Sequence, residues 1–232
     1  MSCGTAPPTV LTTSTAGSNV SSSSSSSSSS ELRVEPAGVR WLTPGLRKYS
    51  CQLTIDTNTV SRKVRLSEDN RKVTHVRKLQ SYPDHPDRFD VHQLLCRTGL
   101  TGRCYWEVEW RGVVETSVSY RRIRRKGLSG DCRFGCNNQS WSLSCSDDGY
   151  SVCHNNRETP ISSSSVSHRV AVYVDCPAGI LSFYRVSSDS LIHLHTFNTT
   201  FTEPLLPGFG FWFGSGSSVF SWSSSGSSVS LC

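Results

Sequence analysis

The most concentrated group of reactive or charged side chains in this chain is a run of basic residues at 121–126 (RRIRRK), with five cations in six positions. The run follows Tyr120 and ends before Gly127. Guanidinium groups bind carboxylates and phosphates, so the run predicts a loop that recognises an acidic peptide or phosphates. A charged loop that only faces water would show the same pattern, and the sequence leaves both interpretations open.

Cysteine is the second group with chemical potential, with ten residues in a chain of 232. Zinc sites pair their ligands across about two to four intervening residues and repeat the pair. Only the first two of five candidate ligands have that spacing: Cys132, Cys136, Cys145, Cys153 and His154. The acidic and histidine residues of 84–92 fit turn contacts better than a metal site. We therefore expect no metal, and reduced cysteines that fill small apolar strand positions.

Catalytic signatures are weak throughout the chain. There is no G-x-S-x-G nucleophile motif, phosphate-binding P-loop or dinucleotide fingerprint. Glu107 and Glu109 share one face of a predicted strand and could form a carboxylate pair, but outward or hydrogen-bonded structural residues explain them better. Cys153 and His154 are neighbours that point opposite ways in a strand, so they do not form a nucleophile–base pair. The sequence predicts no enzyme and no cofactor, and a hydrolase is the weakest hypothesis.

These groups must be positioned by a folded domain. The stretch 100–110 (LTGRCYWEVEW) predicts the central strand of that domain. Aromatic and apolar residues alternate with polar ones from Cys104 onward, the period of a half-buried β-strand. Trp106 and Trp110 share one face and bring large apolar surfaces to a core. We expect both indoles to be buried.

Further short strands recur at intervals of roughly ten residues, joined by Gly, Asp and Pro turns. The sequence Asp147-Asp148-Gly149 is the clearest hairpin signal. No amphipathic helix pattern appears between Ser50 and Cys232. The pattern predicts an all-β, two-sheet antiparallel sandwich. The strand segments are 51–55, 64–67, 72–76, 93–96, 116–120, 141–145, 150–154, 169–175, 180–184, 191–197 and a last one that begins at 207.

The end of the chain contains a duplication. The sequence 216–219 (GSSV) recurs at 226–229, and Trp212 and Trp222 have the same offset. Only one copy can pair as the terminal strand, so we expect the other to loop out.

The organisation along the chain follows from composition. Residues 1–30 end in ten consecutive serines and predict a disordered leader, 31–49 a connector, and 50–232 one folded domain. The formal charge of +6 permits either nucleic acid or an acidic partner. No stretch approaches the roughly 18 apolar residues of a membrane span, and the N-terminus has no secretion signal. We expect a cytoplasmic protein without membrane insertion.

The order of several motifs resembles the B30.2 (PRY-SPRY) domain, with PRY at about 50–98 and SPRY at about 99–232. The resemblance is closest to the C-terminal B30.2 domains of fish NACHT/leucine-rich-repeat (NLR) receptors, with tripartite-motif (TRIM) and stonustoxin-like proteins next. The motifs are LTIDTNT at 53–59, VRLSEDNRKV at 64–73, PDHPDRF at 83–89, YWEVE at 105–109, WSL at 141–143 and VDCPAGILSFY at 174–184.

This resemblance implies a bent two-sheet β-sandwich of the concanavalin-like jelly-roll type. It also implies a module that binds proteins or peptides through loops, without catalysis, within innate immune sensing. In TRIM members an acidic residue follows the strand that matches 118–120, and tryptophans follow the position of Trp141. This chain has Arg121 and 144–146 (SCS) at those places, so we expect the acidic–aromatic pocket to be absent.

Three loop groups are the predicted ligand contacts. A protein or peptide is the expected partner, and nucleic acid or another anion bound by 121–126 is the alternative. The sequence does not name the ligand or the oligomeric state. The predicted contacts are Tyr120, Arg121, Arg122 and Arg124; Ser144, Cys145, Ser146, Asp147 and Asp148; and Phe213 and Trp222.

Overall fold

The computed structural model describes residues 40–41, 45–188, 190–213, 221–222 and 225–232, all within the unit Leu32–Cys232. The predicted leader and much of the connector lie outside these residues. Apart from two single-turn 3-10 helices, Arg47–Tyr49 and Gly130–Cys132, the described elements are strands. The all-β prediction is confirmed.

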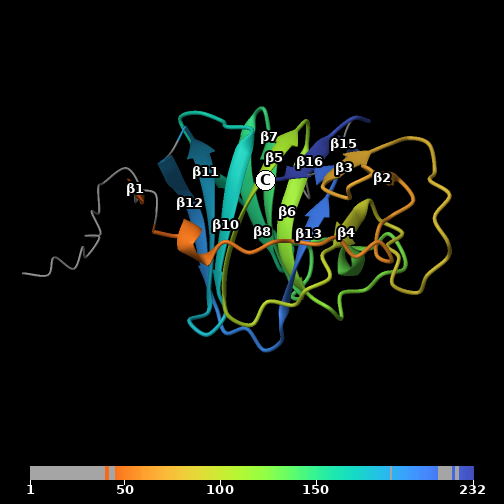
Figure 1. Cartoon of the computed structure of the whole chain (residues 1–232), viewed down its shortest axis with the longest axis horizontal. Coiled ribbons are helices and arrows are strands. Elements are labelled where there is room, and N and C mark those ends of the chain that lie inside the picture. Colours follow the sequence, from red (N-terminus) through yellow and green to blue (C-terminus); the bar gives the residue numbers. More distant parts are fainter. Residues whose placement is uncertain (1–39, 42–44, 189, 214–220, 223–224) are drawn as a thin grey trace, which may run out of the picture. The chain divides into compact units, whose positions relative to one another are not determined.

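Two antiparallel sheets face each other across the core (Figure 1). The eight-stranded sheet has the order β1-β12-β11-β10-β5-β16-β3-β2, and the six-stranded sheet has the order β4-β13-β6-β7-β8-β9. Strands β14 and β15 form a separate two-stranded sheet. The bounds are β1 Arg40–Trp41, β2 Val64–Leu66, β3 Lys72–His75, β4 Gln93–Leu95, β5 Arg103–Arg111, β6 Val114–Tyr120, β7 Ser140–Ser146, β8 Gly149–His154, β9 Arg157–Ile161, β10 Arg169–Asp175, β11 Ile180–Ser187, β12 Ser190–Asn198, β13 Leu205–Gly210, β14 Trp212–Phe213, β15 Ser221–Trp222 and β16 Ser228–Leu231.

Strand β5 lies inside the larger sheet, paired with β10 on one side and β16 on the other. Its alternation places Trp106 and Trp110 in the main core cluster, 4% and 1% exposed. Val118 and Leu143 of the opposite sheet belong to the same cluster. The sequence prediction for this strand is confirmed.

The outer face of the six-stranded sheet is also covered, because a smaller cluster packs over part of it. The segment between β6 and β7 contributes Ile123, Cys132 and Phe134, which pack with residues near β4 such as Phe89 and Leu95. The polar residues of β6 and β7 that point away from the main core are therefore buried as well.

Segment 51–55 does not form the predicted strand. Only single bridges flank it, Ser50 to Tyr105 and Ile55 to Cys96. Cys51 is instead disulfide-bonded to Cys104, with Cα atoms 5.6 Å apart, a normal separation for a disulfide. The expectation that the cysteines are reduced is wrong for this pair, because the first residues of the domain run directly beside β5, where Ser50 bridges Tyr105.

Strand β9, Arg157–Ile161, was not predicted from the sequence. It is the edge of the six-stranded sheet and contains Pro160, a residue that edge strands tolerate because no neighbour needs its missing N–H. The duplicated segment behaves as expected where it is described. Its second copy forms β16 between β5 and β3, and the first copy lies outside the described residues.

None of the helices in the described part of the chain is long and apolar enough to cross a membrane.

Candidate functional site

Part of the basic run 121–126 is used inside the domain. The Arg125 guanidinium lies 4.6 Å from the centre of the Phe89 ring and donates to the Arg121 carbonyl at 2.9 Å. Lys126 donates to the Arg88 carbonyl at 2.9 Å. Both cations thus have partners within the domain, and Arg125 is the more enclosed of the two, since Lys126 is exposed.

The three remaining cations, Arg121, Arg122 and Arg124, are exposed. Arg122 is ion-paired with Glu203 at 2.9 Å. Tyr120, predicted to contact the ligand beside them, is only 4% exposed. Its hydroxyl accepts the Thr202 N–H at 3.1 Å and its ring packs edge-on against Trp141. Tyr120 is a core residue and cannot contact a partner.

The second predicted group lies at the other end of the same strands. β6 and β7 are antiparallel, with Ser119 opposite Ser140 at one end and Val114 opposite Cys145 at the other. Six residues of strand separate Tyr120 from Val114, about 20 Å at the usual rise. Cys145 points into the core and is fully buried, so it too is not a contact residue.

The third predicted group, Phe213 and Trp222, lies on strands that follow β13 at this same end of the six-stranded sheet. β13 ends at Gly210, which is opposite Glu115 on β6, and β14 with Phe213 follows. Trp222 is on β15, paired with β14. The structure therefore brings the hairpin at 144–148 toward β14 and β15, and separates both from the basic run.

Glu115 is a functional candidate that the sequence reasoning missed. It lies between Gly210 and Ser144 in the sheet and is 7% exposed. The Ser144 hydroxyl donates to Oε1 at 3.4 Å, and Oε2 has no hydrogen-bond partner among the described residues. A Cβ at position 210 would lie 2.8 Å from that oxygen, so glycine there leaves room for the carboxyl group.

Burial raises the pKa of the Glu115 carboxyl well above its ordinary value, and the neighbouring Cys136 adds to the effect. A carboxyl group donates a hydrogen bond as well as accepting one when it is protonated, the form that burial favours. The acid comes from within strand β6, and only the pairing of β6 with β7 and β13 places it beside Ser144.

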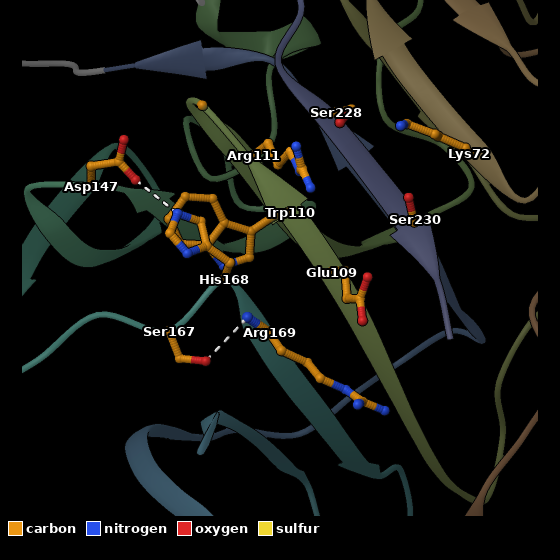
Figure 2. Close-up of a pocket in the computed structure, with 11 residues that line it drawn as sticks. Lys72, Glu109, Trp110, Arg111, Asp147, Ser167, His168, Arg169, Ser228 and Ser230 are labelled. Carbon is orange, nitrogen blue, oxygen red and sulfur yellow. Dashed lines mark hydrogen bonds and ion pairs between the residues drawn. The ribbon is translucent and has the colours of Figure 1, made fainter. Parts of the chain in front are cut away.

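The tip of the β7–β8 hairpin forms the rim of this region. Asp148 is exposed, whereas Asp147 is paired with His168 at 3.0 Å. His168 lies over the Trp110 ring, with 4.8 Å between ring centres (Figure 2). The hairpin is thus attached to β5 of the larger sheet through a fixed contact.

The five residues considered for zinc do not form one site. Cys145 faces the main core, whereas Cys153 faces outward and contacts the Gly135 carbonyl at 3.3 Å. A hydrogen bond with Cys153 lowers the pKa of the Cys136 thiol to about 7. His154 is stacked on Trp141 at 4.5 Å. No group of three or more potential metal ligands occurs in the part of the chain that the structure describes.

Comparison with known families agrees with this architecture. The SPRY domain matches residues 103–221, and the SPRY-associated PRY domain matches 53–100. The chain belongs to the PRY-SPRY (B30.2) family. Together the two matches contain the whole six-stranded sheet, the hairpin at 144–148 and the eight-stranded sheet except β1 and β16.

Similar proteins include toxins and tripartite-motif proteins. Stonustoxin subunit alpha of Synanceia horrida is 42% identical over 165 residues, 69% of this chain and 24% of that protein. Tripartite motif-containing protein 16 of Mus musculus is 37% identical over 167 residues, 70% of this chain and 30% of that protein. This PRY-SPRY chain thus spans only about a quarter of the length of the curated relatives that it matches.

Solved structures show the same likeness. The stonustoxin structure has a TM-score of 0.71 at 35% identity, with 82% of this chain and 28% of that chain covered. The TRIM65 PSpry domain has a TM-score of 0.69 at 27% identity, with 83% of this chain and 96% of that chain covered.

Proposed function

We propose that this PRY-SPRY domain is a non-catalytic protein-interaction module. Its ligand surface is the end of the six-stranded sheet at the hairpin tip 146–148, where Asp147 and Asp148 are exposed. Glu115 and Ser144 lie beneath this tip, 7% and 6% exposed, and we call the whole group the hairpin surface. PRY-SPRY domains are typically protein-interaction modules. The single observation that supports this location is the buried Glu115 carboxyl, whose Oε2 has no hydrogen-bond partner in the described residues.

The chemistry of the hairpin surface fits a peptide backbone. A neutral carboxyl group both donates and accepts, and the serine hydroxyls of β7 do the same. Peptide N–H and C=O groups need partners of both kinds when a ligand covers them. The rigid sheet holds these groups while the exposed tip, with Asp148, is free to vary among relatives.

The alternative, a nucleic acid or another anion bound by 121–126, receives less support. Arg125 and Lys126 hold the loop against the domain, and Arg122 is paired with Glu203. Fewer free cations mean weaker attraction for a polyphosphate chain. This leaves Arg121 and Arg124 as the best-placed cations, too few for a strong salt-dependent interaction.

The cellular setting is a further part of the proposal: innate immune sensing in the cytoplasm, within a longer receptor of the NLR type. The seven described free cysteines suit a reducing compartment. The Cys51–Cys104 disulfide suits an oxidising one. Mass spectrometry of the chain isolated from cells under alkylation distinguishes the two, because a cytoplasmic protein would keep Cys51 and Cys104 reduced.

A comparative pull-down tests the proposed function. Wild type, an Asp148→Arg variant and an Arg121→Ala/Arg122→Ala variant are incubated with cell extract, and retained proteins are identified. We expect the hairpin variant to lose partners that the arginine variant keeps, with all melting temperatures similar. The opposite pattern would move the site to the basic run. A partner that binds all three variants equally would reject both surfaces.

The non-catalytic part is tested separately. The wild-type domain is incubated with a broad panel of esters and peptides, and we expect no turnover. Hydrolysis that survives repurification and disappears in Glu115→Gln would contradict the proposal.

A further inference from the structure

Strand β16 places only short side chains on the outer face of the eight-stranded sheet. Val229 is in the core, so Ser228 and Ser230 point outward. Ser230 lies opposite Lys72 of β3 on one side and Glu109 of β5 on the other. Ser228 lies opposite Arg111 of β5. Serines between longer neighbours leave a trough along β16 (Figure 2).

Two adjoining cavities occupy this trough, with volumes of about 690 and 350 Å³. Lys72, Arg111 and Ser228 line both of them. The larger one extends over β5 to His168, and the smaller one extends over β3 to Arg65 on β2. The trough therefore crosses the sheet between β2 and β10.

The charges in the trough differ from those elsewhere on this sheet. Arg169 is paired with Glu107 at 2.7 Å, as Arg103 is with Asp175 at 2.8 Å. Lys72 and Arg111, by contrast, are exposed, and within the described residues neither side chain has an ion-pair or hydrogen-bond partner. Both point toward β16 in Figure 2. Two unpaired cations thus face each other above serine hydroxyls.

We propose that this β16 trough binds an extended acidic peptide segment of a partner protein. A carboxylate of that segment sits between Lys72 and Arg111 and accepts a hydrogen bond from Ser228. Glu109, which also has no partner among the described residues, pairs with a basic side chain where the segment has one and repels the carboxylates of a segment that has none. Asp147 of the hairpin surface also lines the trough, but Glu115 and Ser144 do not, and Lys72 and Arg111 are not part of the hairpin surface, so variants at these residues distinguish the two proposals.

The trough lies over β3, β16 and β5, and it extends to Arg65 of β2 on one side and to Arg169 of β10 on the other. An extended peptide segment that crosses these strands fits it. A nucleic acid fits less well, because it carries a phosphate charge at every nucleotide and cannot avoid Glu109 and Asp147, which also line the cavity. A peptide can place neutral residues beside these two carboxylates. The one indole at the site, Trp110, is 1% exposed and offers no surface for base stacking.

Fluorescence anisotropy with the full chain tests the proposal. The probe is a labelled peptide in which glutamate alternates with serine, so that its carboxylates share one face when it is extended. A single-stranded oligonucleotide of equal charge is the competitor. We expect saturable peptide binding that weakens as salt is added, and little displacement by the oligonucleotide. Absence of peptide binding, or stronger binding of the oligonucleotide, would overturn the proposal.

Three variants locate the binding. Lys72→Glu/Arg111→Glu should weaken peptide binding by about tenfold or more, since each exposed ion pair contributes up to about 1 kcal/mol and each reversal adds repulsion. Glu109→Gln should strengthen it, a gain that a folding defect cannot imitate. Lys78→Glu/Arg124→Glu, with the same change in net charge at exposed positions outside the trough, is the matched control.

The outcomes separate the trough from general attraction to a positively charged protein. Binding that falls in the trough variant and persists in the control supports the site. Equal weakening in both double variants, or unchanged binding in the trough variant, rejects it. Melting temperatures measured on the same samples show whether each variant is folded.

Discussion

The Glu107 carboxylate on β5 lies 2.7 Å from the Arg169 guanidinium on β10, at the outer face of the larger sheet. Arg47 approaches it at 2.9 Å, and the Tyr105 hydroxyl donates to it at 2.5 Å. Burial by itself would raise the pKa of this carboxyl. The hydrogen bonds from Tyr105 and Arg47, together with the charge of Arg169, outweigh burial and lower the pKa below its ordinary value.

This arrangement predicts that Glu107→Gln destabilises the domain. Glu107 has a lowered pKa in the folded state, so its contribution is complete above the unfolded pKa and is lost as pH falls through the folded value. We expect a loss of about 1–3 kcal/mol near pH 7, which shrinks in acid. Urea unfolding near pH 7 and in acid measures this loss of stability. Glu109→Gln is the control, because Glu109 is two residues further along the same strand and is exposed. Equal losses in both variants would contradict the prediction.

Glu115 should show the opposite pH dependence. Its pKa is raised by burial, so stability is complete below the unfolded pKa and decreases as pH rises toward the folded one. Glu115→Gln removes the cost of ionisation, about 1.4 kcal/mol for each unit of the shift. We expect the variant to be more stable than wild type at mildly alkaline pH and similar near pH 4. A parallel pH profile for the two proteins would show that Glu115 is ionised in the fold.

Trp106→Ala should be strongly destabilising. The indole is 4% exposed in the main core, and removal of a buried tryptophan side chain costs about 3–5 kcal/mol. Thermal and denaturant unfolding measure the loss. Leu79→Ala, at a side chain that is 58% exposed, should leave the midpoint nearly unchanged. A Trp106→Ala midpoint equal to wild type would disprove the core position.

The Cys51–Cys104 disulfide should contribute to stability through the unfolded chain. It closes a loop across 53 residues, for which loop-closure entropy gives about 4 kcal/mol. Cys51→Ser should lower the free energy of unfolding by up to this amount in oxidising buffer and by much less with reductant present. Cys232→Ser, at an exposed free cysteine, is the control. Rapid thiol labelling of native Cys51 would argue against the bond.

Local pattern was sufficient for the central strand and the fold class. The alternation from Cys104 to Trp110 reports which side chains share a face, and the structure confirms it. The same alternation at 51–55 failed. A period of two does not show whether a neighbouring strand has a free edge, and β5 is already paired on both sides with β10 and β16.

The candidate sites depended on pairing over long sequence distances, which no local pattern contains. The hairpin at Asp147-Asp148 was predictable from turn chemistry. Glu115 became a candidate only because β13 places Gly210 beside it. The trough requires β16 to lie between β3 and β5, and residues from both ends of the domain then face each other.

The position of β16 has a consequence for biosynthesis. Both of its neighbours are translated long before it, yet neither is joined to the other without it. Until residues 228–231 have been added, the nascent chain can hold only two separate fragments of this sheet, β2–β3 and the strands from β5 to β1, and each fragment has an open edge where β16 will pair.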